Sequence, residues 1–243
     1  MKLKSFGCSF VWGSDLPDEV PGKNSSLLSW PAVLANKIGY KYECLARPGV
    51  GNFFIANQIL TQIQTLNQPS LFVINWTWID RFDYVGSQND QDWRCIAPSQ
   101  WKAIRPGDDS PEAIHYYKTI HSQFRDKLQS LILIYTCVQE LDRRGIPYIN
   151  CMMDQLMYEN EFHHTPAMKL MQDYLAPRTT WFDGKNFLDW AKGHHYKTSP
   201  NWHLLQEGNA AVADYLVYAL RNNQIPTCQT DAVILPLAHK PIS

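Results

Sequence analysis

The pattern of apolar and polar positions predicts a set of short strands. Residues 41–45 alternate between apolar and polar side chains, as a half-buried strand does. Residues 71–76 form an apolar run, which is typical of a central strand in a parallel sheet. Further apolar segments indicate strands at residues 3–6 and 146–152, and residues 181–184 indicate a strand end with a turn.

Helical spacing of apolar residues fills the chain between these strands. Helices are predicted at residues 29–38, 53–66, 166–174, 185–191 and 206–220, and residues 113–144 form either one long helix or two. Strands that alternate with helices favour a doubly wound α/β fold. We therefore expect one domain over residues 1–243, a three-layer α/β/α flavodoxin-like sandwich with a central parallel sheet.

Two segments interrupt this rhythm. Residues 80–112 are rich in acids, amides and proline and are too long for an ordinary connection, so they predict an insertion or lid beside the site. Trp93 and Trp101 in this segment favour partial order over a loose surface loop. Residues 223–243 form a proline-rich C-terminal extension, which packs either along the domain or across a homodimer.

Composition narrows the classes of function. The chain has 243 residues, of which 45% are hydrophobic, and its formal net charge is −1. The absence of a basic run argues against nucleic acid as the main partner. No apolar stretch is long enough for a membrane span, and the N-terminal residues do not resemble a signal peptide. The scattered cysteines, without a Cys-x-x-Cys pair, indicate reduced thiols and a cytoplasmic protein.

The first strand leads directly into residues that could carry chemistry. Gly7 ends the apolar run, Ser9 follows at once, and Gly13 comes shortly afterwards. Ser9 is therefore expected at the carboxyl edge of the sheet, either in a simple turn or as a nucleophile. His203, before the last predicted helix, belongs to the same edge in this topology and could act as its general base.

Three short motifs resemble the SGNH (GDSL-type) hydrolases. Residues 6–10, Phe-Gly-Cys-Ser-Phe, resemble the first block of that family, in the variety found in phage and bacterial hypothetical proteins. Residues 49–52, Gly-Val-Gly-Asn, resemble the second block, and residues 201–203, Asn-Trp-His, resemble the last. The resemblance implies Ser9 as nucleophile, His203 as base and the N–H groups of Ser9 and Gly49 as oxyanion donors.

Two positions differ from the family pattern. Asn201 stands where the family places an aspartate, so Asn201 is predicted to orient His203, with Asp183 and then Asp189 as alternatives. The third block has no asparagine in register, and Thr77 or Asn75 is the candidate oxyanion donor there. Cys8 is a less favoured nucleophile, because its side chain should point opposite to that of Ser9.

The resemblance implies a metal-independent serine esterase that needs no cofactor. Expected substrates are small acyl esters, including O-acetyl groups on carbohydrate. Histidine pairs at residues 163–164 and 194–195 are expected to be loop residues rather than metal ligands. The alternatives are an O-acyltransferase that uses the same site and a degenerate, non-catalytic domain that binds glycan or protein. Predicted substrate-binding residues are Asn52, Asn75, Trp76 and Trp202, and Trp78 is expected to help them form an aromatic cleft.

Overall fold

A computed structural model describes residues 1–86, 100–159, 162–225 and 227 of the chain. Its main sheet has four strands, which match four of the predicted strand segments: β1 (Lys2–Phe6), β2 (Lys41–Cys44), β3 (Ser70–Trp76) and β6 (Tyr148–Met152). The strands lie in the order β2-β1-β3-β6, and all neighbouring pairs are parallel. The central strand β3 is buried along its whole length.

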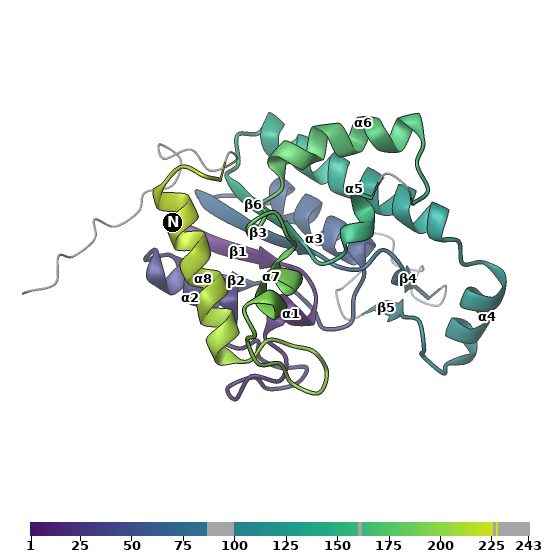
Figure 1. The fold of residues 1–243 in the computed structure, drawn as a ribbon, viewed down its shortest axis with the longest axis horizontal. Helices are drawn as coiled ribbons and strands as arrows, with labels where there is room; N and C mark the ends of the chain where they lie inside the picture. The colour runs from purple at the N-terminus through teal and green to yellow at the C-terminus, as the bar shows by residue number, and fades with distance from the viewer. Residues whose placement is uncertain (87–99, 160–161, 226, 228–243) are drawn as a thin grey trace, which may run out of the picture.

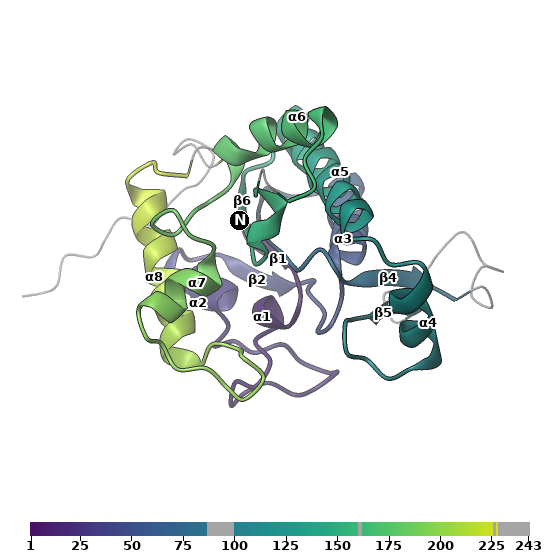
Figure 2. The same cartoon turned by 45° about the vertical axis from the view of Figure 1, so that its right-hand side comes forward.

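Helices cover both faces of this sheet, so the expected three-layer α/β/α architecture is confirmed (Figure 1). One side carries α2 (Trp30–Lys37), α7 (Phe187–Gly193) and α8 (Gln206–Arg221); the other carries α3 (Asn52–Gln64), α5 (Gln123–Arg143) and α6 (Pro166–Leu175). Figure 2 shows the two groups on opposite sides of the strands. No helix in the described part of the chain is long and apolar enough to cross a membrane.

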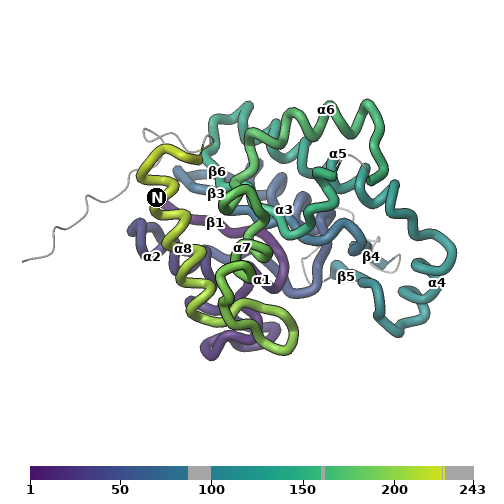
Figure 3. The backbone as a smooth tube through the Cα atoms, viewed as in Figure 1, coloured from purple at the N-terminus to yellow at the C-terminus, as the bar shows by residue number. Residues whose placement is uncertain are grey.

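The two halves of the chain meet between α2 and α8. Asn209 is buried on α8, and its Oδ1 accepts a hydrogen bond of 2.9 Å from the backbone N–H of Trp30. Its Nδ2 donates to the carbonyl oxygen of Leu204 at 2.7 Å. The tube in Figure 3 shows these N-terminal and C-terminal helices side by side. One side chain therefore joins the start of α2 to the segment that precedes α8.

The predicted insertion contains a second, small sheet. Strands β4 (Phe82–Val85) and β5 (Trp101–Ile104) pair antiparallel beside α3, and α4 (Pro111–Thr119) follows them. Trp101 is buried, with its ring centroid 5.3 Å from that of Phe53 and 5.9 Å from that of Phe54. Trp93 and the middle of the insertion lie outside the described residues, so the lid stays a prediction.

Other sequence predictions are partly altered. The region 113–144 is broken into α4 and α5, one of the two alternatives. Residues 181–184 contain the predicted turn but no strand, because only an isolated bridge joins Phe182 to Lys185. Most of the C-terminal extension lies outside the described residues, although Ile225 is buried against the core.

Candidate active site

Ser9 begins a short helix directly after β1. Helix α1 (Ser9–Trp12) starts one residue after its N-cap, Cys8, and ends at Gly13 in the left-handed conformation. Gly7 makes the abrupt turn possible, because a Cβ there would lie 2.5 Å from Cγ2 of Val11. At the first helical position the N–H of Ser9 has no partner within the helix. The sequence prediction of a turn with Ser9 at the sheet edge therefore matches this geometry.

His203 is held by a tight turn before α8. The N–H of Ser199 donates to the carbonyl oxygen of His203 at 2.8 Å, and an isolated bridge joins Thr198 to Leu204. Trp202 has a positive φ of 67°, a conformation that costs a non-glycine residue about 1–3 kcal/mol. The hydrogen bonds of the turn thus fix the histidine backbone and hold Trp202 in this strained conformation.

The side chains of Ser9, His203 and Asp15 form a chain of hydrogen bonds. Nε2 of His203 lies 2.9 Å from Oγ of Ser9, and its Nδ1 lies 2.7 Å from Oδ2 of Asp15. The ring of Phe10 packs edge-on against the imidazole, with centroids 4.9 Å apart. A hydroxyl, an imidazole and a carboxylate in this order are the constellation of serine hydrolases.

Asp15 is surrounded by hydrogen-bond donors. Oγ of Ser199 donates to its Oδ2 at 2.6 Å, and Nδ2 of Asn201 donates to the same oxygen at 3.2 Å. The hydrogen bonds from Ser199 and His203 hold the pKa of the Asp15 carboxyl below its usual value. The carboxylate is therefore ionised when it faces the imidazole, and it can stabilise an imidazolium.

The structure places Asp15, rather than Asn201, against the ring of His203. Asn201 has a different position, because its amide faces Asp15 and its backbone N–H donates to Ser199. The alternative acid Asp183 accepts from the indole N–H of Trp190 at 2.9 Å. Asn186 caps the helix that carries Asp189, and its Nδ2 donates to Oδ2 of Asp189 at 2.7 Å. None of these three side chains has a recorded contact with His203.

Two backbone N–H groups can serve as oxyanion donors. Within the described residues, no hydrogen bond is recorded for the N–H of Ser9 or of Gly49. Gly49 has φ 83°, which favours glycine at this turn, and it lines the same cleft as Ser9. Both residues of the predicted donor pair therefore line one cleft.

Thr77 lies behind the cleft rather than in its lining. The side-chain amide of Asn52 makes two hydrogen bonds to the backbone of Thr77. Oδ1 accepts from the N–H of Thr77 at 2.9 Å, and Nδ2 donates to the carbonyl oxygen of Thr77 at 3.2 Å. Oγ1 of Thr77 is buried without a recorded partner. The Asn52 amide thus fixes the end of β3 instead of facing a substrate.

The small sheet holds the Gly49 turn from behind. Oδ1 of Asp83, on β4, accepts from the N–H of Gly51 at 2.7 Å, and Oδ2 accepts from the N–H of Phe54 at 2.8 Å. Nη1 of Arg81 donates to the carbonyl oxygen of Val50 at 3.0 Å. Burial raises the pKa of Asp83 to about 6. The predicted insertion therefore supports the turn that contains Gly49.

A cleft of about 730 Å³ opens above the triad. Trp78 and the strongly exposed Trp202 contribute aromatic surface to it, as the sequence predicts. Asn75 and Trp76 do not line it: both are fully buried, and the indole N–H of Trp76 donates to Asn150. The other lining residues include Phe10, Ser14, Pro48, Arg81, Arg105, Leu188, Lys192 and Pro200.

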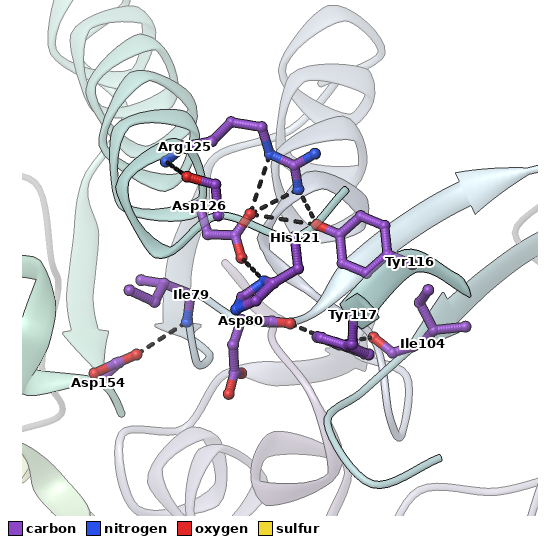
Figure 4. Close-up of polar contacts among 10 residues, drawn as sticks. Ile79, Asp80, Ile104, Tyr116, Tyr117, His121, Arg125, Asp126 and Asp154 are labelled. Carbon is purple, nitrogen blue, oxygen red and sulfur yellow. Dashed lines mark hydrogen bonds and ion pairs between the residues drawn. The ribbon is translucent and has the colours of Figure 1, made fainter. Parts of the chain in front are cut away.

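A buried polar network fixes the segment that follows β3 (Figure 4). Oδ2 of Asp154 accepts from the N–H of Ile79 at 2.9 Å, and the hydroxyl of Tyr117 donates to the carbonyl oxygen of Asp80 at 2.6 Å. Next to it, Nδ1 of His121 lies 2.9 Å from Asp126. The network anchors Ile79 and Asp80, the two residues between Trp78 and Arg81.

The other sequence candidates lie away from the cleft. Cys8 is completely buried and does not line it. His163 packs against aromatic rings, and Nδ1 of His194 lies 2.9 Å from the carbonyl oxygen of Trp190. Among the described residues, no three His, Cys, Asp or Glu side chains gather as metal ligands would.

Sequence reasoning missed Asp15 and the basic residues Arg81, Arg105 and Lys192. Asp15 carries one usable signal, since it follows soon after Ser9 and the Gly13 turn. Its side-chain direction depends on a positive φ of 68°, which periodicity does not reveal. The three basic residues converge from separate segments, so no local motif marks them.

Comparison with solved structures finds similar chains among esterases and lipolytic proteins. A member of the lipolytic protein G-D-S-L family from Veillonella parvula has a TM-score of 0.47 and 13% identity, over 90% of this chain and 97% of that one. An acetyl xylan esterase from Butyrivibrio proteoclasticus has a TM-score of 0.43 and 13% identity, over 92% and 64%.

A family two carbohydrate esterase from Clostridium thermocellum has a TM-score of 0.41 and 11% identity, over 92% of this chain and 64% of that chain. No protein-family model and no curated sequence matches the chain. Because these TM-scores and identities are low, the fold and the site rest on the sheet order and the contacts described above.

Proposed function

We propose that the protein is a serine esterase that hydrolyses small acyl esters, with O-acetyl groups on carbohydrate as the expected class. The observation that carries this proposal is the hydrogen-bonded chain Ser9–His203–Asp15 at the floor of an open cleft. Its three groups supply a nucleophile, a base and an acid that orients the base. The exposed ring of Trp202 supports carbohydrate, because an aromatic face can stack on a sugar ring.

The geometry supports a two-step acyl transfer. Oγ of Ser9 attacks the ester carbonyl while Nε2 of His203 takes its proton, and the Asp15 carboxylate stabilises the imidazolium. The N–H groups of Ser9 and Gly49 donate to the oxyanion. His203 then protonates the leaving alkoxide, which departs as the alcohol and leaves an acyl-Ser9 ester. Water attacks that ester with His203 as base, and the acid and free Ser9 are released.

Fluorophosphonate labelling together with an esterase assay tests this function. We expect mass spectrometry to locate the label on Ser9, and we expect Ser9→Ala to lower the rate with 4-nitrophenyl acetate to near background. The matched control is Ser14→Ala, which removes another hydroxyl from the same cleft and should keep the label. Hydrolysis that is unaffected by Ser9→Ala would refute the esterase.

A further inference from the structure

Positive charge lies on both sides of the nucleophile. Arg81 and Arg105 line the cleft beside the small sheet, and Lys192 lines it from the last turn of α7. Figures 1 and 2 both show α1 between α7 on one side and β5 on the other. None of the described residues that line the cleft carries a carboxylate. The charged side chains that line this cleft are therefore all positive, although the whole chain is nearly neutral.

Arg105 directs one end of its guanidinium toward the turn that contains Gly49. Nη2 bonds to Asp108 at 3.1 Å, and the backbone N–H of Arg105 donates to the same carboxylate at 2.9 Å. Nη1 lies 4.0 Å from the point where a Cβ on Gly49 would stand. Asp108 thus orients the side chain while Nη1 faces the place where an ester would bind.

Arg81 is positioned by its neighbours and retains free donors. One N–H donates to the carbonyl oxygen of Val50, and the guanidinium carbon lies 4.8 Å from the centroid of Trp78. No ion pair is recorded for Arg81 within the described residues. Its remaining N–H groups are therefore available, and the network in Figure 4 anchors the segment that carries it. A guanidinium with free donors in a fixed place is suited to binding an oxyanion group.

The other side of the cleft adds one further positive charge, that of Lys192. Nζ of Lys192 lies 5.5 Å from the ring centroid of Trp202, and the described residues provide it with no ion pair. Four carboxylates lie near these charges, and each has other partners or is partly buried. Asp15 is hydrogen-bonded to His203, and Asp83 is buried under the N–H groups of Gly51 and Phe54. Asp108 accepts a hydrogen bond from Nη2 of Arg105. Asp80 is partly buried next to Arg81; burial raises the pKa of Asp80, and the charge of Arg81 opposes this rise.

We propose that the ester substrate carries a second, anionic group, a carboxylate or a phosphate, and that Arg81 and Arg105 bind this group next to the scissile bond. The proposal rests on the esterase function above and narrows it to a substrate class. Lys192 adds attraction from the opposite rim. A neutral ester fits the same triad but makes no use of the remaining N–H donors of the two guanidinium groups.

A matched pair of aryl acetates tests the proposal. 4-Acetoxybenzoate is an anion, and 4-acetoxybenzamide is a neutral molecule of nearly the same shape. With each kcat/KM divided by the hydroxide-catalysed rate of that ester, we expect the wild type to favour the anion about tenfold at low salt. The preference should shrink as ionic strength rises, because salt screens exposed charges.

Variants locate the preference on the two arginines. Arg105→Gln should lower the anion-to-neutral ratio about two- to fivefold, and Arg81→Gln with Arg105→Gln should bring it close to one. Arg143→Gln is the matched control, since this exposed arginine of α5 lies outside the cleft and should leave the ratio unchanged. The ratio is the readout because a general loss of folding lowers both rates together.

The outcomes separate this proposal from the esterase itself. If Ser9 hydrolyses both esters with a ratio near one that Arg105→Gln does not change, the anion proposal is wrong and the esterase stands. If neither ester is hydrolysed, the affinity of each ester for the Ser9→Ala protein is measured by calorimetry. This comparison tests the anion preference independently of catalysis. Tighter binding of 4-acetoxybenzoate than of 4-acetoxybenzamide supports the proposal, and equal affinity overturns it.

Discussion

His203 is held at both ring nitrogens by residues that are close neighbours in the sequence. Ser9 and Asp15 flank the α1 turn, and each presents an oxygen to one side of the imidazole. Asp15 adopts a positive φ, which is a strained conformation for a non-glycine residue. Hydrogen bonds from Ser199 and Asn201 hold its carboxylate in this position and favour its ionised form. At the scale of residues, the orienting acid therefore comes from the nucleophile's own segment.

The roles of Asp15 and Asn201 can be separated by substitution. Asp15→Asn should lower kcat on the order of 10³- to 10⁴-fold, because the imidazolium loses its carboxylate and the tautomer is no longer fixed. Asn201→Ala should lower it less than about tenfold, because its amide contacts only the acid. Steady-state kinetics with 4-nitrophenyl acetate measures both. A larger loss in Asn201→Ala than in Asp15→Asn would contradict this assignment.

At the scale of elements, strands β4 and β5 support the turn that contains Gly49. The main contact is made by Asp83, and it is sensitive to pH. Burial raises the pKa of Asp83 from 3.8 to about 6, so the folded protein binds more protons than the unfolded chain between these pH values. Stability from this group must therefore fall as pH rises through that window. For a buried group, a pKa rise of this size corresponds to a loss of about 3 kcal/mol in the free energy of unfolding across the window.

Asp83→Asn should remove this dependence. We expect the free energy of unfolding of the variant minus that of the wild type to increase between about pH 4 and pH 7, because only the wild type loses stability as this group ionises. Urea unfolding at several pH values measures the difference. Asp109→Asn, which removes an exposed carboxylate from the loop after β5, is the control and should leave the profile unchanged. A constant difference between Asp83→Asn and wild type would show that Asp83 does not titrate in this range.

The elements were largely predictable from sequence, and the site was less so. The apolar run 71–76 and the helical spacing of 206–220 reflect burial, so both appear close to their expected bounds. Residues 181–184 failed as a strand because their apolar side chains pack between helices without a strand partner. Ser9 and His203 were found because glycine turns and helix starts mark them, whereas Asp15 depends on a side-chain direction that no spacing records.

At the scale of the whole molecule, the site is assembled from the two ends of the chain. Asn209→Ala should remove the link between α2 and the segment before α8, and leave the Trp30 N–H without its partner. We expect a loss of about 1–3 kcal/mol in the free energy of unfolding, with reduced esterase activity as His203 loses its support. Denaturant unfolding and kinetics measure the two effects. Asn222→Ala, at the exposed end of α8, is the matched control.

Because the nucleophile and the acid share one short segment, removing the histidine should leave their two oxygens facing an empty space of imidazole size. His203→Ala should therefore be a candidate for chemical rescue. We expect added imidazole to restore part of the lost esterase rate in a saturable manner, since both hydrogen-bonding partners are already in place. His203→Ala combined with Asp15→Ala should show much weaker rescue. Equal rescue in the single and double variants would mean that Asp15 does not help to hold the base.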